Sequence, residues 1–158
     1  MKKMLFVIII CLLSFPLFAE KWRDYVPDQY ENLVEDQCNK YRLPVDIVVS
    51  IGYVESCWKN VEGYTGDIGI FQLNKWYITY YEEKFWERKM AFNPWNPYHN
   101  IELSIRYIHW LYHLTDKNWE YTIKSYNVGI NRLRREIQVY PTYADPYYFK
   151  VMRALSNL

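Results

Sequence analysis

The sequence predicts a mainly α-helical fold in a single domain, with little or no β structure. Over most of the chain, apolar residues recur every three or four positions, which is the period of a helix with one buried face. Short β-branched runs such as residues 47–49 lie inside windows with this helical period, so the signals for strands are weak. Glycine (5) and proline (7) are sparse, and no linker, repeat or low-complexity tract divides residues 20–158.

Proline and turn residues separate the first predicted elements. A helix over 28–41 ends before Pro44, whose ring disfavours helical backbone in the residue before it. A second helix over 45–57 has Asp46 in its first turn, where a carboxylate faces the positive end of the helix dipole. The next predicted segments are a turn-rich stretch at 59–67, a short segment at 69–76 and a polar, aromatic segment at 77–89.

The longest predicted helix covers 98–114 and follows an Asn-Pro-Trp-Asn-Pro break at 93–97. Four apolar residues, spaced three or four apart, form one stripe along it: Ile101, Ile105, Ile108 and Leu111. Further helices are predicted at 119–126, 130–137 and 145–155, with residues 127–129 as a break between the first two.

Residues 1–19 have the pattern of a secretory signal peptide. Lys2 and Lys3 precede an apolar run from 4 to 18, and Ala19 follows it. The run is shorter than the roughly 20 residues that a membrane-spanning helix needs. We therefore expect export to the periplasm or cell envelope with cleavage near Ala19, and an uncleaved N-terminal anchor is the alternative.

The expected mature chain, residues 20–158, is almost neutral. Removing Lys2 and Lys3 from the 19 Lys and Arg leaves 17, against 18 Asp and Glu, for a net charge of −1. Nucleic-acid-binding domains carry a high positive charge. The charge therefore excludes nucleic acid as the expected partner.

Cys38 and Cys57 remain in the mature chain, and an oxidising compartment permits a disulfide. If the helices flanking Pro44 form an antiparallel hairpin, Cys57 lies roughly 10 Å further along the axis than Cys38. This exceeds the Cα separation of about 7 Å that a disulfide tolerates. Pairing stays open, because a bent connection or non-helical ends would permit it.

Glu55 falls on the face of its helix that should point toward the core. Ile47, Ile51, Glu55 and Trp58 are spaced by four, four and three residues. Burial disfavours a charged carboxylate and raises its pKa, and a carboxyl protonated near neutral pH can act as a general acid on a leaving oxygen. The alternative interpretation is a Glu satisfied by backbone N–H groups or by an Arg at a helix end.

Three motifs in the chain resemble those of the lytic transglycosylases related to goose-type lysozyme. They are ESCW at 55–58, GDIGIFQ at 66–72 and SYNVG at 125–129. In that family a Glu-Ser pair ends a helix, a Gly-Leu-Met-Gln-like segment follows, and an Ala-Tyr-Asn-x-Gly-like segment lies further on. Pro97, Asn100 with Ile101, and Tyr107 are similar to the family's lead into a long helix. The resemblance covers about residues 30–152 and implies a lysozyme-like fold.

The resemblance also implies roles for individual residues. Glu55 would be the catalytic acid that then acts as base. Gln72 and Tyr126 would help to hold the sugar and the carboxyl group, and Asn127 would support the turn at Tyr126.

Further roles follow from the same resemblance for the loop after Glu55. The backbone of Gly69, Ile70 and Phe71 would line the cleft, and Ile70-Phe71 replaces the family's Leu-Met with side chains of similar size. Ser56 would cap or brace the catalytic helix. Thr65 is the candidate for a hydroxyl that the family often places in this loop.

The implied reaction cleaves the MurNAc-β-1,4-GlcNAc bond of peptidoglycan and uses no cofactor and no metal. Glu55 would protonate the glycosidic oxygen and then, as a carboxylate, take a proton from the C6 hydroxyl of the muramic sugar. That hydroxyl attacks C1 and closes a 1,6-anhydro ring. Neither a water molecule nor a second protein carboxylate is needed, unlike in two-carboxylate glycosidases.

Asp67 keeps a second reaction open. Beside Gly66 it could position a water or stabilise positive charge, which would make the enzyme a hydrolytic muramidase. The alternative is a turn Asp bonded to its own backbone. From a different functional class, the chain could be a catalytically silent peptidoglycan-binding component of an envelope assembly.

Two further groups of residues have compositions that occur in binding sites. His99, His109 and His113 have the spacing of metal ligands, but the intervening residues lack the Glu of the zinc-protease pattern, so no metal is expected. A basic cluster could meet the carboxylates of peptidoglycan stem peptides or an anionic partner, with a solvated helix face as the alternative. The cluster consists of Lys124, Arg132, Arg134 and Arg135.

We expect peptidoglycan glycan strands as the partner of a monomeric protein. By analogy, the small size suits an enzyme that serves a secretion or flagellar envelope assembly.

Overall fold

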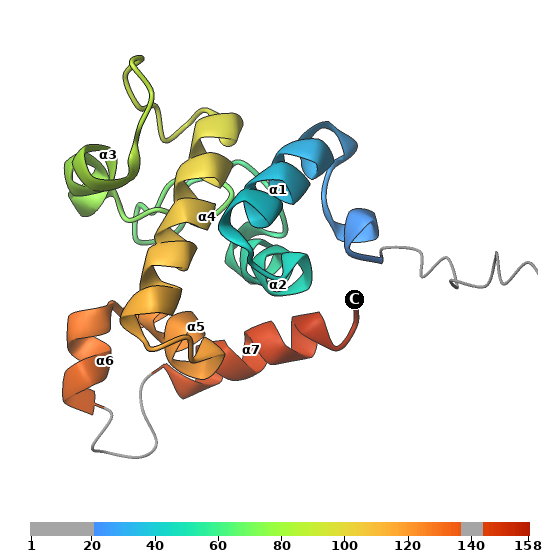
Figure 1. Ribbon diagram of the computed structural model, residues 1–158, viewed down its shortest axis with the longest axis vertical. Coiled ribbons are helices and arrows are strands. Elements are labelled where there is room, and N and C mark those ends of the chain that lie inside the picture. Colours follow the sequence, from blue (N-terminus) through green and yellow to red (C-terminus); the bar gives the residue numbers. More distant parts are fainter. Residues whose placement is uncertain (1–20, 137–143) are drawn as a thin grey trace, which may run out of the picture.

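Helices make up most of the part of the chain that the computed structural model describes, residues 21–136 and 144–158 (Figure 1). The elements in chain order are the 3-10 helix η1 (Lys21–Tyr25), α1 (Asp28–Tyr41), α2 (Val45–Ser56), the 3-10 helix η2 (Lys75–Tyr77), α3 (Ile78–Phe85), α4 (Pro97–Leu114), α5 (Trp119–Val128), α6 (Ile130–Glu136) and α7 (Asp145–Leu155). These residues contain no strand, only isolated bridges from Glu62 to Ile68 and from Ile68 to Leu73. The predicted mainly α class is confirmed.

The predicted helix bounds agree with the structure to within two residues wherever the predicted helix lies in the described ranges. Three details differ. The segment 77–89 contains the helix α3, and 69–76 consists of turns and η2. The break predicted at 127–129 is confined to Gly129, because α5 continues through Val128. The last residue of the predicted helix 130–137 lies outside the described residues.

α4 lies at the centre of the molecule and packs against α1, α3 and α5 (Figure 1). It begins at Pro97, after Asn96, whose side-chain oxygen accepts hydrogen bonds from the backbone N–H groups of Tyr98 and His99. The predicted stripe of Ile101, Ile105, Ile108 and Leu111 is buried throughout. Since Leu103 and Tyr107 are also buried, α4 has packed neighbours on more than one face.

α7 is the last helix of the chain and packs on α2, which is distant in sequence. It also packs against α5 (Figure 1). Val151 of α7 is fully buried in the same core cluster as Ile51 of α2 and Ile123 of α5. The C-terminal helix is therefore held beside the helix that ends near Glu55.

The two cysteines of the described part of the chain are free thiols. Cys38 is fully buried in α1, and Cys57 is exposed as the residue that caps the C-terminus of α2. The disulfide that the sequence left open is not formed. None of the helices in the described ranges is long and apolar enough to cross a lipid bilayer.

Asn100 joins α4 to the loop between α2 and η2. Its side-chain oxygen accepts a hydrogen bond from the Phe71 backbone N–H at 2.9 Å, and its Nδ2 donates to the carbonyls of Ile68 at 3.0 Å and Pro94 at 3.1 Å. Gly69 has a φ of +83°, and a Cβ there would lie 2.3 Å from Asn100 Nδ2. The close approach of the loop to α4 thus requires a glycine at 69.

We expect Asn100→Ala to lower the free energy of unfolding by about 2–4 kcal/mol, because it leaves a buried N–H and two carbonyls without partners. Urea unfolding measures this change. Asn39→Ala is the matched control, since Asn39 is exposed in α1 and alanine favours helix. Equal stability of Asn100→Ala and the parent protein would show that the loop does not depend on these bonds.

Candidate active site

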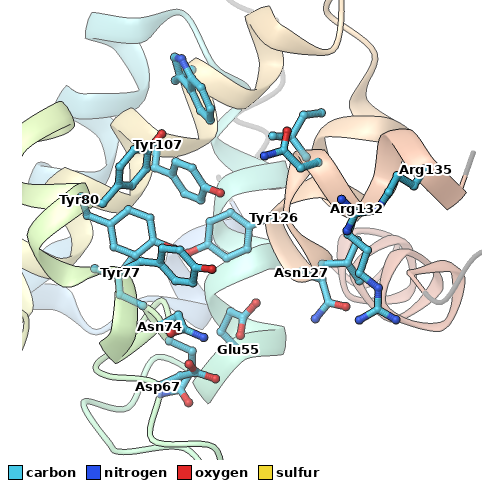
Figure 2. A pocket seen from close by; sticks show the side chains of 18 residues that line it. Glu55, Asp67, Asn74, Tyr77, Tyr80, Tyr107, Tyr126, Asn127, Arg132 and Arg135 are labelled. Atoms are coloured by element: carbon cyan, nitrogen blue, oxygen red, sulfur yellow. The ribbon is translucent and has the colours of Figure 1, made fainter.

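A cavity of about 630 Å³ opens between α3, α5 and α6, with Glu55 on its surface (Figure 2). Three parts of its lining differ in chemistry. The acidic floor consists of Glu55 and Asp67, and the α6 end consists of Asn131, Arg132 and Arg135. The aromatic wall consists of Tyr77, Tyr80, Tyr81, Tyr107 and Trp110. Figure 2 shows Tyr126 between the aromatic wall and the α6 end, above Glu55.

Glu55 lies in the last turn of α2, where the chain reverses sharply. Cys57 and Trp58 both adopt the left-handed conformation, with φ values of 52° and 59°. The reversal folds the buried Trp58 ring back onto α2, so that its Nε1 donates to the Val49 carbonyl at 3.2 Å. Glu55 itself is half-buried and faces the cavity, while Ile51 on the same face is fully buried.

The carboxyl of Glu55 has a strongly perturbed acidity. Burial raises its pKa from the ordinary value of 4.5 to about 7, and the nearby negative charge of Asp67 contributes in the same direction. The Tyr147 hydroxyl donates a hydrogen bond to Glu55 Oε1 at 2.5 Å and lowers the pKa in part. The raised pKa agrees with the prediction from helix periodicity, and the partner is a tyrosine hydroxyl rather than an Arg or a backbone N–H.

Tyr147 is the site residue that sequence reasoning missed. It lies in the first turn of α7, 92 residues after Glu55, and it is buried. The chain contains 17 tyrosines, and Tyr148 follows directly, so nothing local distinguishes Tyr147 from the others. Only the packing of α7 against α2 identifies it.

An ion pair locks α7 against α5 near this contact. Lys124 Nζ lies 2.5 Å from Asp145 Oδ1, and both side chains are almost fully buried. Lys124 also pairs with Glu120 at 2.6 Å. Because Lys124 is buried and paired, it is not part of an exposed basic cluster with the three arginines. The pair fixes the N-terminal turn of α7, from which Tyr147 reaches Glu55.

Tyr126 links α5 to the loop behind the acidic floor. Its hydroxyl donates to the Phe71 carbonyl at 2.8 Å, and its ring lies 5.6 Å from that of Tyr107. Burial raises the pKa of Tyr126 well above its ordinary value, so the hydroxyl stays neutral. Asn127 lines the cavity but is exposed, and its side chain makes no hydrogen bond within the described residues, so it does not support a turn at Tyr126.

The loop of the second motif lies partly behind the cavity. The expectation that Gly69, Ile70 and Phe71 line the cleft differs from the structure, in which all three are buried outside the cavity lining. Their carbonyls and N–H groups are used internally, because Ser56 Oγ donates to the Ile70 carbonyl at 2.7 Å. Ser56 thus braces the end of α2.

Gln72 is the residue of this motif that reaches the cavity. Its backbone is left-handed, with a φ of 49°. Its Nε2 donates to the carbonyls of Gly69 at 2.7 Å and Val61 at 3.1 Å, which ties two parts of the loop together. Gln72 therefore has a structural role in the loop as well as a place on the cavity surface.

Asp67 faces the same cavity as Glu55. Its Oδ2 accepts a hydrogen bond from the Thr65 hydroxyl at 2.5 Å, and its buried Oδ1 has no partner in the part of the chain described. The carboxylate is thus not bonded to its own backbone. Thr65 is exposed and does not line the cavity, so it acts on the site through Asp67.

The three histidines with metal-ligand spacing do not line the cavity. His109 packs against Tyr41 and His113, and His99 Nδ1 accepts a hydrogen bond from the Asn93 backbone. Over residues 21–136 and 144–158, no group of three His, Cys, Asp or Glu side chains could hold a metal ion.

One family model and three solved structures that match this chain show its family and its fold. The model of the Transglycosylase SLT domain family matches residues 32–149. The 70 kDa soluble lytic transglycosylase SLT70 from Escherichia coli is similar in structure, with 19% identity and a TM-score of 0.71 over 80% of this chain and 23% of that chain. A structure of the 70-kDa soluble lytic transglycosylase in complex with bulgecin A gives 19% identity and a TM-score of 0.71, over 82% of this chain and 24% of that one.

An inactive mutant of the lytic transglycosylase Slt from Pseudomonas aeruginosa is also similar, with 15% identity and a TM-score of 0.64 over 89% of this chain and 24% of that chain. The chain thus spans about a quarter of the length of these proteins. No curated protein matches the sequence. The family match and the shared architecture together identify the chain as a member of the Transglycosylase SLT domain family with a lysozyme-like, mainly α fold.

Proposed function

We propose that this protein is a lytic transglycosylase that cleaves the MurNAc-β-1,4-GlcNAc bond of peptidoglycan and forms 1,6-anhydro-MurNAc. The observation that carries the proposal is Glu55, a carboxyl with a pKa of about 7 on the surface of a cavity large enough for a glycan segment. Membership of the SLT domain family supports the same reaction class.

In the proposed reaction, Glu55 acts first as an acid and then as a base. Protonated Glu55 gives its proton to the glycosidic oxygen while the bond from C1 of the muramic sugar to that oxygen breaks, and positive charge develops at C1. The resulting Glu55 carboxylate takes the proton of the C6 hydroxyl, and the C6 oxygen forms the new bond to C1. The proton that Glu55 lost is thereby restored, and no water is consumed.

A pKa near neutrality suits both steps. A carboxyl with an ordinary pKa would be ionised before it could protonate a leaving oxygen, whereas a much higher pKa belongs to a group that does not release its proton readily. The Tyr147 hydroxyl stabilises the carboxylate between the two steps, because it donates to Glu55 Oε1. Tyr147 is therefore proposed as a positioning and charge-stabilising residue.

The aromatic wall is suited to hold sugar rings. Its side chains present polarised ring faces and hydroxyls, and apolar C–H faces of sugars pack on such surfaces. Tyr77 and Tyr80 are exposed, so their rings are accessible to a ligand. Tyr126 lies between this wall and the catalytic carboxyl, where it would contact the sugar whose bond is cleaved.

Hydrolysis is the second candidate reaction, and Asp67 is the observation that favours it. Asp67 shares the acidic floor with Glu55, and its Oδ1 has no hydrogen-bond donor in the part of the chain described. The Asp67 carboxylate on the cavity surface could orient a water toward C1, and the product would then carry a reducing end.

A digestion experiment distinguishes these possibilities. Purified peptidoglycan sacculi are incubated with the parent protein, Glu55→Gln and Asp67→Asn, and the soluble muropeptides are identified by mass spectrometry. We expect the parent to release products lighter than hydrolytic ones by one water. Glu55→Gln should lower the rate by at least about a hundredfold, which is the usual contribution of a general acid.

Other outcomes assign the remaining interpretations. Reducing-end products that disappear in Asp67→Asn would establish hydrolysis. If the parent releases nothing but binds sacculi, and Glu55→Gln binds equally well, the protein is a silent peptidoglycan-binding component. Circular dichroism of each variant confirms that the helical fold is retained.

We also infer that residues 1–19 direct export and are removed near Ala19, which would bring the enzyme to peptidoglycan in the periplasm or cell envelope. Intact-mass measurement of the protein expressed from its full sequence checks this. A mature N-terminus at residue 20 is expected, and a retained leader would indicate an N-terminal anchor. Service to a secretion or flagellar assembly is tested by pulldown from envelope extracts, where recovery of no assembly component would contradict it.

A further inference from the structure

The α6 end gives the cavity a second chemical character, away from the acidic floor. Positions 131, 132 and 135 share one side of α6, and all three line the cavity. Leu133 is buried on the other side of the helix, and Arg134 is exposed but does not line the cavity. The arrangement therefore separates two cavity arginines from a third arginine that points elsewhere.

Three polar side chains at this end of the cavity have no partner within the described ranges. Arg132 pairs with Glu136 at 2.5 Å, whereas Arg135 makes no ion pair or hydrogen bond with any residue of the described ranges. The side-chain amides of Asn127 and Asn131, which line the same end, also make no hydrogen bond within those ranges. One uncompensated guanidinium therefore stands beside two free amide groups, a set that suits a carboxylate on a peptide.

The proposed substrate identifies which carboxylate this is. The sugar rings of peptidoglycan are neutral and offer a guanidinium no charged partner, but the peptide on the lactyl group of the muramic sugar carries carboxylates. Resting on the function proposed above, we propose that Arg135, with Arg132, binds a carboxylate of this stem peptide, so that the enzyme acts on peptide-bearing strands in preference to bare glycan.

Position and charge both favour this assignment. The peptide is attached to the same sugar whose C1 reacts, so it begins within one sugar ring of Glu55, and one cavity holds both Glu55 and the arginines. Figure 2 shows the two arginines across Tyr126 from Tyr77 and Tyr80. Sugars bound on the aromatic wall would therefore not occupy the α6 end, which stays accessible to the peptide. The acidic floor repels a carboxylate, and the arginines attract it, which fixes the direction in which the peptide leaves the cleft.

The test compares two substrates made from one preparation. Glycan strands are used either with their peptides or after an amidase has cut the bond between the lactyl group and the peptide. The cut leaves a free lactyl carboxylate on each muramic sugar, so both substrates are anionic. They differ in that only the peptide-bearing strands carry carboxylates beyond the lactyl group. The measured quantity is the ratio of kcat/KM for peptide-bearing strands to kcat/KM for bare strands.

We expect Arg135→Gln to lower this ratio about threefold to tenfold, the usual range for a partly exposed charged contact. Arg134→Gln removes the same charge outside the cavity and should keep the parent ratio. An unchanged ratio in Arg135→Gln, or an equal fall in Arg134→Gln, would overturn the proposal, because the effect would then be absent or would reflect net charge alone.

A binding measurement separates this inference from the proposed reaction. In the Glu55→Gln background, calorimetry measures the affinity for GlcNAc-MurNAc-peptide and for the peptide-free disaccharide. Tighter binding of the peptide form that is lost with Arg135→Gln supports the inference even if the parent protein releases no products. Cleavage of sacculi with equal affinity for the two ligands would leave the reaction in place and overturn the inference.

Discussion

The site depends on one carboxyl group being kept out of water. Glu55 ends α2 on a face that otherwise points to the core, and its burial raises the pKa to about 7. The cost of a charged form there is moderated by a hydrogen bond from the Tyr147 hydroxyl. These two opposing effects set the acidity of the group, and a pKa near neutrality suits the proposed use of one carboxyl as both acid and base.

Several contacts between residues far apart in sequence position the helices and the loop around Glu55. Asn100 of α4 binds the loop that follows α2, and Ser56 binds the same loop at the Ile70 carbonyl. On the other side, the buried pair of Lys124 and Asp145 joins α5 to α7. The Glu55 carboxyl is therefore supported from the loop and from the C-terminal helix, by bonds that each need a folded partner. Breaking a buried pair of this kind leaves a charge without compensation, which is costly.

The sequence predicted those features of the fold that depend on local signals, such as helix period and capping residues. Helix period, prolines and caps placed α1, α2, α4 and α7, and the same periodicity put Glu55 on the wrong face for a carboxylate. It did not reveal Tyr147, because the packing of α7 on α2 is a tertiary contact with no local pattern. Tertiary packing also buries Ile70 and Phe71 behind the cavity. It buries Lys124 as well, apart from the exposed arginines, because Asp145 compensates the charge of Lys124 in the interior.

The central claim is tested most directly by titrating Glu55 with carbon NMR on protein labelled at the glutamate carboxyls, with Glu55→Gln to assign the signal. The account predicts a pKa near 7, a lower pKa in Asp67→Asn, which removes a like charge, and a higher pKa in Tyr147→Phe, which removes a donor to the carboxylate. Because the folded state binds this proton more tightly than the unfolded chain, the stability that Glu55 contributes is lost as pH rises from about 4.5 through 7. As an acid, Glu55 is active below its pKa, so the activity on sacculi should fall above pH 7. A pKa near 4.5 in the parent protein would contradict the account, because Glu55 would then be ionised at the pH where it must donate a proton.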